Sequence, residues 1–244
     1  MSECNTFCLL VVKEPVTTDL YRIRSSDFPF STAETCVVVV SDSFLQAIVH
    51  RCLYIVRYVS AKPRHADEWR DEAWRMIQER SDCTFFMITK RPERIKDHIP
   101  SVAYEWDHLT IAVTCENQWM AEKRLPLYLS LPLRHHCVMI EPMLSRVNLR
   151  PYFLEYPGVI ESVSVGGESG PDARPCDYAW VLDVHMQCVE NSAAFSYHQT
   201  GAKLIRNGKV YTIPREKQHE QAHKAKLDYD PATGLRSFLD MPGE

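Results

Sequence analysis

Residues 159–170 read VIESVSVGGESG, an apolar run that stops abruptly at two glycines. The run predicts a buried β-strand at Ile160–Val165, and Gly166 and Gly167 predict a turn whose backbone can approach a ligand closely and donate hydrogen bonds to it. The carboxylate of Glu168, next in the chain, can accept an amine or a hydroxyl. Other apolar runs of the chain also end in polar residues, so we expect a site built from several strand ends.

Five more segments have the composition of short strands, because they are rich in β-branched or aromatic residues. They are Cys36–Val40, Thr84–Ile88, Leu109–Val113, Cys137–Ile140 and Ala194–Tyr197. Most are apolar throughout rather than alternating, which is typical of strands buried on both faces of a parallel sheet. Between the strands lie helical patterns at Asp67–Arg80, Asn117–Leu131 and Cys176–Glu190, and we expect Pro126 to bend or break the second of them.

This alternation predicts an α/β fold with mainly parallel strands. An open doubly wound sheet and a partial (β/α) barrel both fit, and we favour the partial (β/α) barrel. We expect a divergent or truncated amino-terminal segment over residues 1–65, which includes the first strand, a (β/α) core over 66–201, and a hairpin with a charged helical tail over 202–244. The hairpin, at Leu204–Tyr211, is closed by Asn207-Gly208, and Arg215–Lys226 is the helix of the tail.

Composition places the chain among ordinary globular proteins. Its 244 residues are 45% hydrophobic and 25% charged, with a formal net charge of −4, which gives no global reason to expect nucleic acid or an acidic membrane surface as a partner. Nine cysteines, an odd number without a paired framework, favour the reducing cytoplasm over secretion. Met1–Val12 lacks the features of a signal peptide and charges interrupt Phe44–Val59, so we expect a soluble protein with no membrane partner.

In a (β/α) architecture the loops that follow the strands share one mouth, where catalytic groups lie. The catalytic candidates are Lys90, Glu116, Glu141 and His198, since acids and bases crowded together shift each other's pKa values. The ligand-binding candidates at the same ends are Asp42, Asn117, Gly166, Gly167, Glu168, Ser169 and Gln199. Loops are polar in any protein, and Asn117 can simply cap a helix. For the whole set of strand ends, a functional site is the better explanation.

No metal ligands are predicted. Cys4 and Cys8 have the spacing that begins a three-cysteine iron–sulfur motif, but Val11 stands where the third ligand is needed. We expect other cysteines to pack as small hydrophobic residues, namely Cys83, Cys115, Cys137 and Cys188. We expect His135-His136 to lie in a solvated loop.

Six motifs occur in an order and spacing that resemble one known family. They are TKRPER at 89–94, VTCENQ at 113–118, EPML at 141–144, GGESG at 166–170, DARP at 172–175 and HQTG at 198–201. Over about Ala66–Tyr229, and at the strand Val37–Phe44, the chain is similar to the phage-type family named for gene products thirty-seven and sixty-eight, a domain of unknown function.

Members of that family resemble radical S-adenosylmethionine enzymes and typically carry a cysteine element of the form C-x6-C-x2-C-Y. The resemblance implies a partial (β/α) barrel with an iron–sulfur cluster and S-adenosylmethionine at its mouth, and it places Gly166, Gly167 and Glu168 on the wall that faces the cofactor. This chain lacks the cysteine element, so the cluster ligands of the family are absent from it. It also has the segment Leu45–His65 in place of a short connection, and His198 where the family commonly has lysine.

The favoured hypothesis is a radical S-adenosylmethionine-like protein with a small polar ligand, inactive in radical chemistry unless a cysteine loop lies upstream of Met1. The first alternative is a non-catalytic module of phage or mobile-element origin that binds a ligand or a partner at the same mouth. The second is a nucleic-acid accessory protein that uses Lys90, Arg91, Arg94 and the basic residues within 203–226. The sequence leaves the substrate and the reaction open.

Overall fold

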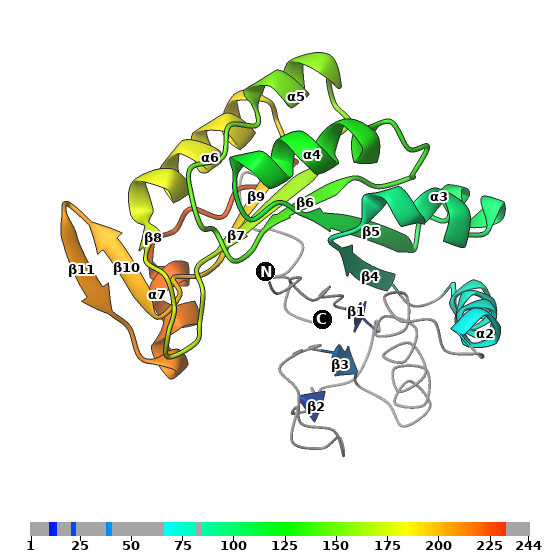
Figure 1. The fold of residues 1–244 in the computed structure, drawn as a ribbon, viewed down its shortest axis with the longest axis horizontal. Coiled ribbons are helices and arrows are strands. Elements are labelled where there is room, and N and C mark those ends of the chain that lie inside the picture. The colour runs from blue at the N-terminus through cyan, green and yellow to red at the C-terminus, as the bar shows by residue number, and fades with distance from the viewer. Residues whose placement is uncertain (1–9, 14–20, 23–37, 41–65, 82–83, 233–244) are drawn as a thin grey trace. The chain divides into compact units, whose positions relative to one another are not determined.

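Figure 1 shows the computed structural model, which describes residues 10–13, 21–22, 38–40, 66–81 and 84–232. Contacts divide the chain into two units. The first contains residues up to Ala112 together with Pro132–Arg134, and the second contains Val113–Leu131 and the chain from His135 onward to Pro242. The predicted strand residues 36–37 and the segment 45–65 lie outside the described residues.

The first unit combines short strands with helices. Its elements are β1 (Leu10–Lys13), β2 (Tyr21–Arg22), β3 (Val38–Val40), α2 (Ala66–Glu79), β4 (Thr84–Thr89), η2 (Pro92–Arg94), α3 (Ile95–His98), η3 (Ser101–Glu105) and the start of β5 (Leu109–Thr114). Strand β1 pairs in parallel with β3 and antiparallel with β4. Beside β4, the amide of Phe85 donates to the carbonyl of His108, 2.7 Å away, at the entrance to β5.

The second unit is a run of strand–helix units followed by a hairpin. After the end of β5 it contains α4 (Gln118–Leu129), β6 (Cys137–Ile140), α5 (Arg150–Glu155), β7 (Ser162–Gly166), β8 (Cys176–Asp177), α6 (Tyr178–Glu190), β9 (Ala194–Gln199), β10 (Lys203–Arg206), β11 (Lys209–Thr212), η4 (Arg215–Lys217) and α7 (Gln218–Lys224). Strands β5, β6, β7 and β9 pair in parallel in that order. A smaller sheet has the order β11-β10-β8.

The observed architecture confirms the α/β class. Helices alternate with strands, and β4, β5, β6, β7 and β9 are neighbours in that order in a mainly parallel sheet. The predicted hairpin and charged helical tail are also present, as β10–β11 and η4–α7. Curvature of the sheet into a partial barrel stays a prediction. Among the described residues, no helix is long and apolar enough to span a membrane.

One face of the parallel strands carries large apolar side chains. Val138, Val163 and Phe195 lie side by side in register on β6, β7 and β9, and each is at most 1% exposed. Helix α6 packs on this face, where the His185 ring lies 5.1 Å from that of Phe195. Figure 1 shows α4, α5 and α6 along the same side of these strands. This face therefore forms the core between the sheet and its helices.

The opposite face carries smaller and more polar side chains. Because side chains alternate along a strand, Met139, Ser164 and Ser196, which are in register with one another, lie on this second face. All three are at most 7% exposed. The residues that continue this row are Glu141, directly after β6, and His198, near the end of β9, so the polar face leads directly to the candidate site.

Pro126 does not break its helix, since α4 continues from Gln118 through Pro126 to Leu129, and a bend at this residue stays a prediction. Proline has no amide hydrogen to donate to the carbonyl four residues earlier, at Glu122. Both residues lie on the exposed side of α4, where water can satisfy that carbonyl. The expected solvated loop is wrong for His136, which is only 6% exposed and packs edge-on against the Tyr128 ring.

Candidate functional site

The carboxyl ends of β6, β7 and β9 meet at the side chain of Glu141. Its Oε2 lies 2.9 Å from Nδ1 of His198, and its Oε1 accepts a hydrogen bond from the Ser164 hydroxyl at 2.6 Å. The Glu141 side chain is 15% exposed and that of His198 is 40% exposed. Two of the four catalytic candidates are thus in direct contact, held by a serine that the sequence analysis did not select.

Strand register explains why these side chains meet. Met139 of β6 pairs with Ser164 of β7, and Ser164 pairs with Ser196 of β9. Glu141 follows Met139 by two residues and His198 follows Ser196 by two, so both lie on the face that carries the Ser164 hydroxyl. The alternation of serine and valine in β7 was the available signal for Ser164, because it places the hydroxyls of this strand on one face.

The environment of Glu141 favours its ionised form. Burial raises the pKa of this carboxyl. The charge of His198 and the hydrogen bonds from His198 and Ser164 lower the pKa by more than burial raises it, so the net pKa lies below the ordinary value. A carboxylate that accepts the Nδ1 proton fixes the tautomer of the imidazole, which makes Nε2 of His198 the nitrogen that exchanges protons. The pair therefore has the arrangement of a general acid–base group.

A second histidine supports the pair from α7. The ring of His219 lies 4.7 Å from that of His198 in an edge-to-face contact. Its Nδ1 donates to the His198 carbonyl oxygen at 2.9 Å. The amide of Thr200 also donates to the carbonyl of Gln218, at 3.2 Å, so α7 is attached to the end of β9 at two points.

The glycines at the end of β7 make room for neighbouring protein atoms. A Cβ on Gly166 would lie 2.9 Å from Oε2 of Glu141, and one on Gly167 would collide with the carbonyl oxygen of Thr200. Gly201 has φ of +76°, and a Cβ there would lie 2.7 Å from the carbonyl carbon of Gly167. These contacts show close approach of two strand ends and a carboxylate. A role of Gly166 and Gly167 in ligand binding stays a prediction.

The candidates after β5 lie in a different set of contacts. Oε2 of Glu116 accepts a bond from Nη1 of Arg124 at 2.6 Å, and both side chains are at most 10% exposed. Arg124 also donates to the carbonyl of Thr114. Asn117 caps α4, with its Oδ1 accepting from the amide of Met120 at 2.9 Å. These contacts attach α4 to the end of β5, and the predicted catalytic and binding roles of Glu116 and Asn117 are untested by them.

Of the remaining candidates, three lie after β7 or at the end of β9, and two lie elsewhere in the chain. Glu168 forms a bidentate ion pair with Arg174, with N–O distances of 2.6 and 2.9 Å. The hydrogen bonds from Arg174 lower the pKa of the Glu168 carboxyl, although partial burial raises it. Gln199 lies beside Gly166, and its carbonyl accepts from the Gly167 amide at 2.9 Å. Ser169 is half-buried in the loop that follows Glu168. Lys90 belongs to the first unit, and Asp42 lies outside the described residues.

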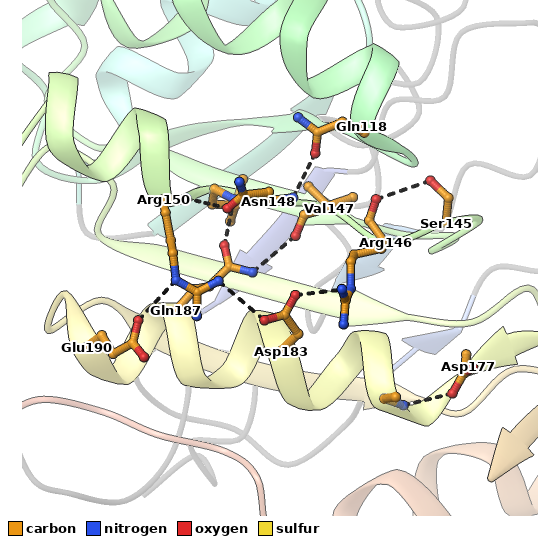
Figure 2. Close-up of polar contacts among 12 residues, drawn as sticks. Gln118, Ser145, Arg146, Val147, Asn148, Arg150, Asp177, Asp183, Gln187 and Glu190 are labelled. Atoms are coloured by element: carbon orange, nitrogen blue, oxygen red, sulfur yellow. Dashed lines mark hydrogen bonds and ion pairs between the residues drawn. The ribbon is translucent and has the colours of Figure 1, made fainter. Parts of the chain in front are cut away.

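The loop after Glu141 is fastened at both of its ends. The amide of Met143 donates to the carbonyl of Gly166 at 2.7 Å, and the amide of Leu144 donates to the carbonyl of Glu116 at 2.8 Å. Figure 2 shows the other end, where the fully buried Gln187 of α6 accepts from the Leu149 amide at 2.6 Å. These bonds hold the segment that carries Glu141 against three neighbouring elements.

Charged contacts reinforce this attachment from the surface of α6. Asp183 accepts from Arg150 at 3.3 Å and pairs with Arg146 at 3.4 Å, while Glu190 pairs with Arg150 (Figure 2). Gln118 of α4 accepts from the amide of Asn148 at 2.7 Å. No local sequence signal indicates this network, because its partners lie far apart in the chain, on α4, on α6 and in the segment at the start of α5.

The described cysteines do not fit an iron–sulfur cluster. They are buried thiols, and burial raises the pKa of Cys115, Cys137 and Cys176 to about 12 and that of Cys188 further. Among the residues that the structure describes, no group of three or more His, Cys, Asp or Glu side chains is arranged to hold a metal ion. Cys4 and Cys8 lie outside those residues.

Comparisons with known proteins give one family. No curated protein and no solved structure matches the chain. A family model described as "Protein of unknown function (DUF5131)" matches residues 58–230, well over half of the chain, and the match includes the Glu141–His198 pair and the hairpin. The chain therefore belongs to the DUF5131 family of proteins of unknown function.

Proposed function

We propose that the second unit binds a small polar ligand at the carboxyl ends of β6, β7 and β9, and that the Glu141–His198 pair exchanges a proton with it. One observation carries this proposal. Three parallel strands bring a largely buried carboxylate, a serine hydroxyl and a half-exposed imidazole together at a single point. The carboxyl ends of parallel strands are where α/β proteins bind their ligands.

The chemistry of the site indicates the class of ligand. Glu141 is held on the protein side by Ser164 and His198, so His198 is the member of the pair that faces outward, with 40% of its side chain exposed. Glu168, which follows the end of β7 by two residues, keeps 28% of its side chain exposed while paired with Arg174. An imidazole beside a carboxylate suits a ligand that carries both hydrogen-bond donors and acceptors, such as an amino acid or a nucleoside.

The resemblance to radical S-adenosylmethionine enzymes makes S-adenosylmethionine the first ligand to test. Its amino group and ribose hydroxyls need acceptors, which Glu168 and the Glu141–His198 pair supply in the proposed mode of binding. When bound in such enzymes this cofactor supplies a radical only together with a cluster. Since the described cysteines do not fit a cluster, the proposal is limited to binding and proton exchange.

Equilibrium dialysis of labelled S-adenosylmethionine against the iron-free protein tests the proposal. We expect Glu141→Gln to weaken binding about tenfold, because it removes the charge that holds His198 in place. The matched control is Glu161→Gln, which alters a second Glu–His pair of the same 2.9 Å length, with His135, before the start of β7. The proposal fails if the wild-type protein binds none of S-adenosylmethionine, methionine and adenosine, or if both variants weaken binding equally.

A further inference from the structure

Strand β11 is an exposed edge of the small sheet β11-β10-β8. All four of its residues are exposed, including Val210 at 60% and Tyr211 at 47%. The strand is held in place by a tight turn, in which Asn207 and Gly208 have φ of 53° and 72°. Positive φ at both positions is typical of the two-residue turn that best matches the twist of a hairpin. Figure 1 shows β11 on the outer side of β10.

The register fixes which backbone groups of β11 face away from β10. Arg206 pairs with Lys209 next to the turn, and the amide of Ile213 donates to the carbonyl of Ala202 at 2.9 Å. Hydrogen-bonded pairs alternate along an antiparallel ladder, so the residues of this strand that bond to β10 are 209, 211 and 213. The N–H and C=O groups of Val210 and Thr212 therefore point outward along the edge.

The edge is basic, although the chain as a whole is acidic. Residues 203–217 contain a single acid, Glu216, against five bases, whereas the formal net charge of the chain is −4. The five are Lys203, Arg206, Lys209, Arg215 and Lys217. The guanidinium of Arg206 lies 5.0 Å from the centre of the Tyr178 ring, which keeps this charge beside the first residue of α6. Lys217 pairs with Glu220, so an approaching strand meets the positive charge of the other four bases, of which Lys209 lies on β11 itself.

We propose that β11 binds an extended, acidic segment of a partner protein, which adds to the sheet as a further strand. The outward N–H and C=O groups of Val210 and Thr212 supply the backbone ladder, and the exposed Val210 side chain supplies apolar contact. Acidic side chains of the partner complement the bases of the hairpin. A second copy of this chain would set the same positive charges against each other. Nucleic acid would leave the outward carbonyls unmatched, since phosphate groups only accept hydrogen bonds.

Fluorescence anisotropy with the full chain and a labelled peptide of alternating glutamate and valine tests this proposal. Val210→Pro removes the outward N–H without removing a bond to β10, a position where an edge strand tolerates proline. We expect it to weaken binding about tenfold, while the matched control Val210→Ile, which keeps both the N–H and an apolar side chain, leaves binding unchanged. Circular dichroism checks that each variant is folded.

A second pair of variants tests the charge without touching the backbone. Lys209→Gln is expected to weaken binding about threefold at low salt, whereas Lys224→Gln on α7, whose charge pairs with Glu220, has no effect. The proposal is overturned if the wild-type chain does not bind the peptide, if a lysine–valine peptide binds as well, or if Val210→Pro has no effect while folded. It is also overturned if oligothymidylate binds more tightly than the peptide, or if the chain forms a dimer that Val210→Pro dissociates.

Discussion

Gly201→Ala tests whether the strand ends at the site depend on close backbone contact. Gly201 has φ of +76°, so any side chain there incurs the left-handed penalty of about 1–2 kcal/mol. The added Cβ would also lie 2.7 Å from the carbonyl carbon of Gly167 and 2.8 Å from the amide nitrogen of Glu168. Both are backbone atoms that cannot rotate aside, so β7 and β9 must separate, at a further cost of about 1–3 kcal/mol.

The matched control is Gly208→Ala in the β10–β11 turn. Gly208 has φ of +72°, but a Cβ there meets nothing within 4 Å. It therefore incurs only the left-handed penalty, and the difference between the two variants isolates the backbone contact. Urea unfolding followed by far-UV circular dichroism measures both losses of unfolding free energy. The reasoning is refuted if Gly201→Ala loses no more stability than Gly208→Ala.

Three further predictions concern the charged and thiol groups of the second unit. The net pKa of Glu141 lies below its ordinary value of 4.5, so the stability that the carboxylate contributes is present above pH 4.5 and is lost as the pH falls through the lowered pKa. Urea titrations at several pH values should therefore show the unfolding free energies of wild type and Glu141→Gln converging at low pH. Arg124→Met should cost about 3–5 kcal/mol by removing the guanidinium partner of the buried Glu116 carboxylate, and adding Glu116→Leu should recover most of the loss in the same assay. Alkylation at pH 8 with mass-spectrometric mapping should leave four buried thiols unmodified in the native protein and modify them in urea; modification in the native state would contradict the burial of Cys115, Cys137, Cys176 and Cys188.

Local sequence signals predicted the elements well. The hairpin at β10–β11 follows from Asn207-Gly208, because turn chemistry depends on neighbouring residues alone. The strand β6 has the predicted bounds, Cys137–Ile140, because an apolar run between polar residues is also a local signal. Pro126 does not break α4, because the effect of a proline within a helix depends on which side of the helix meets water.

The contacts of the site could not be predicted in the same way. The sequence indicated Glu141 and His198 as strand ends, but their bond depends on the register of β6, β7 and β9, which long-range pairing decides. The bond between Glu116 and Arg124 depends instead on how the following helix, α4, packs at the end of β5. The alternation of serine and valine in β7 indicates the face on which the Ser164 hydroxyl lies, but it does not indicate that a carboxylate meets the hydroxyl there.

The central claim is that His198, held by Glu141, contacts the ligand of this site. Heteronuclear NMR of the imidazole nitrogens tests it directly, with His198 assigned through His198→Gln and with His135, the partner of Glu161, as internal control. On addition of S-adenosylmethionine, the account predicts a shift of the Nε2 resonance of His198 and none at His135. Binding of this ligand without a change at His198, or with equal changes at both histidines, would contradict it.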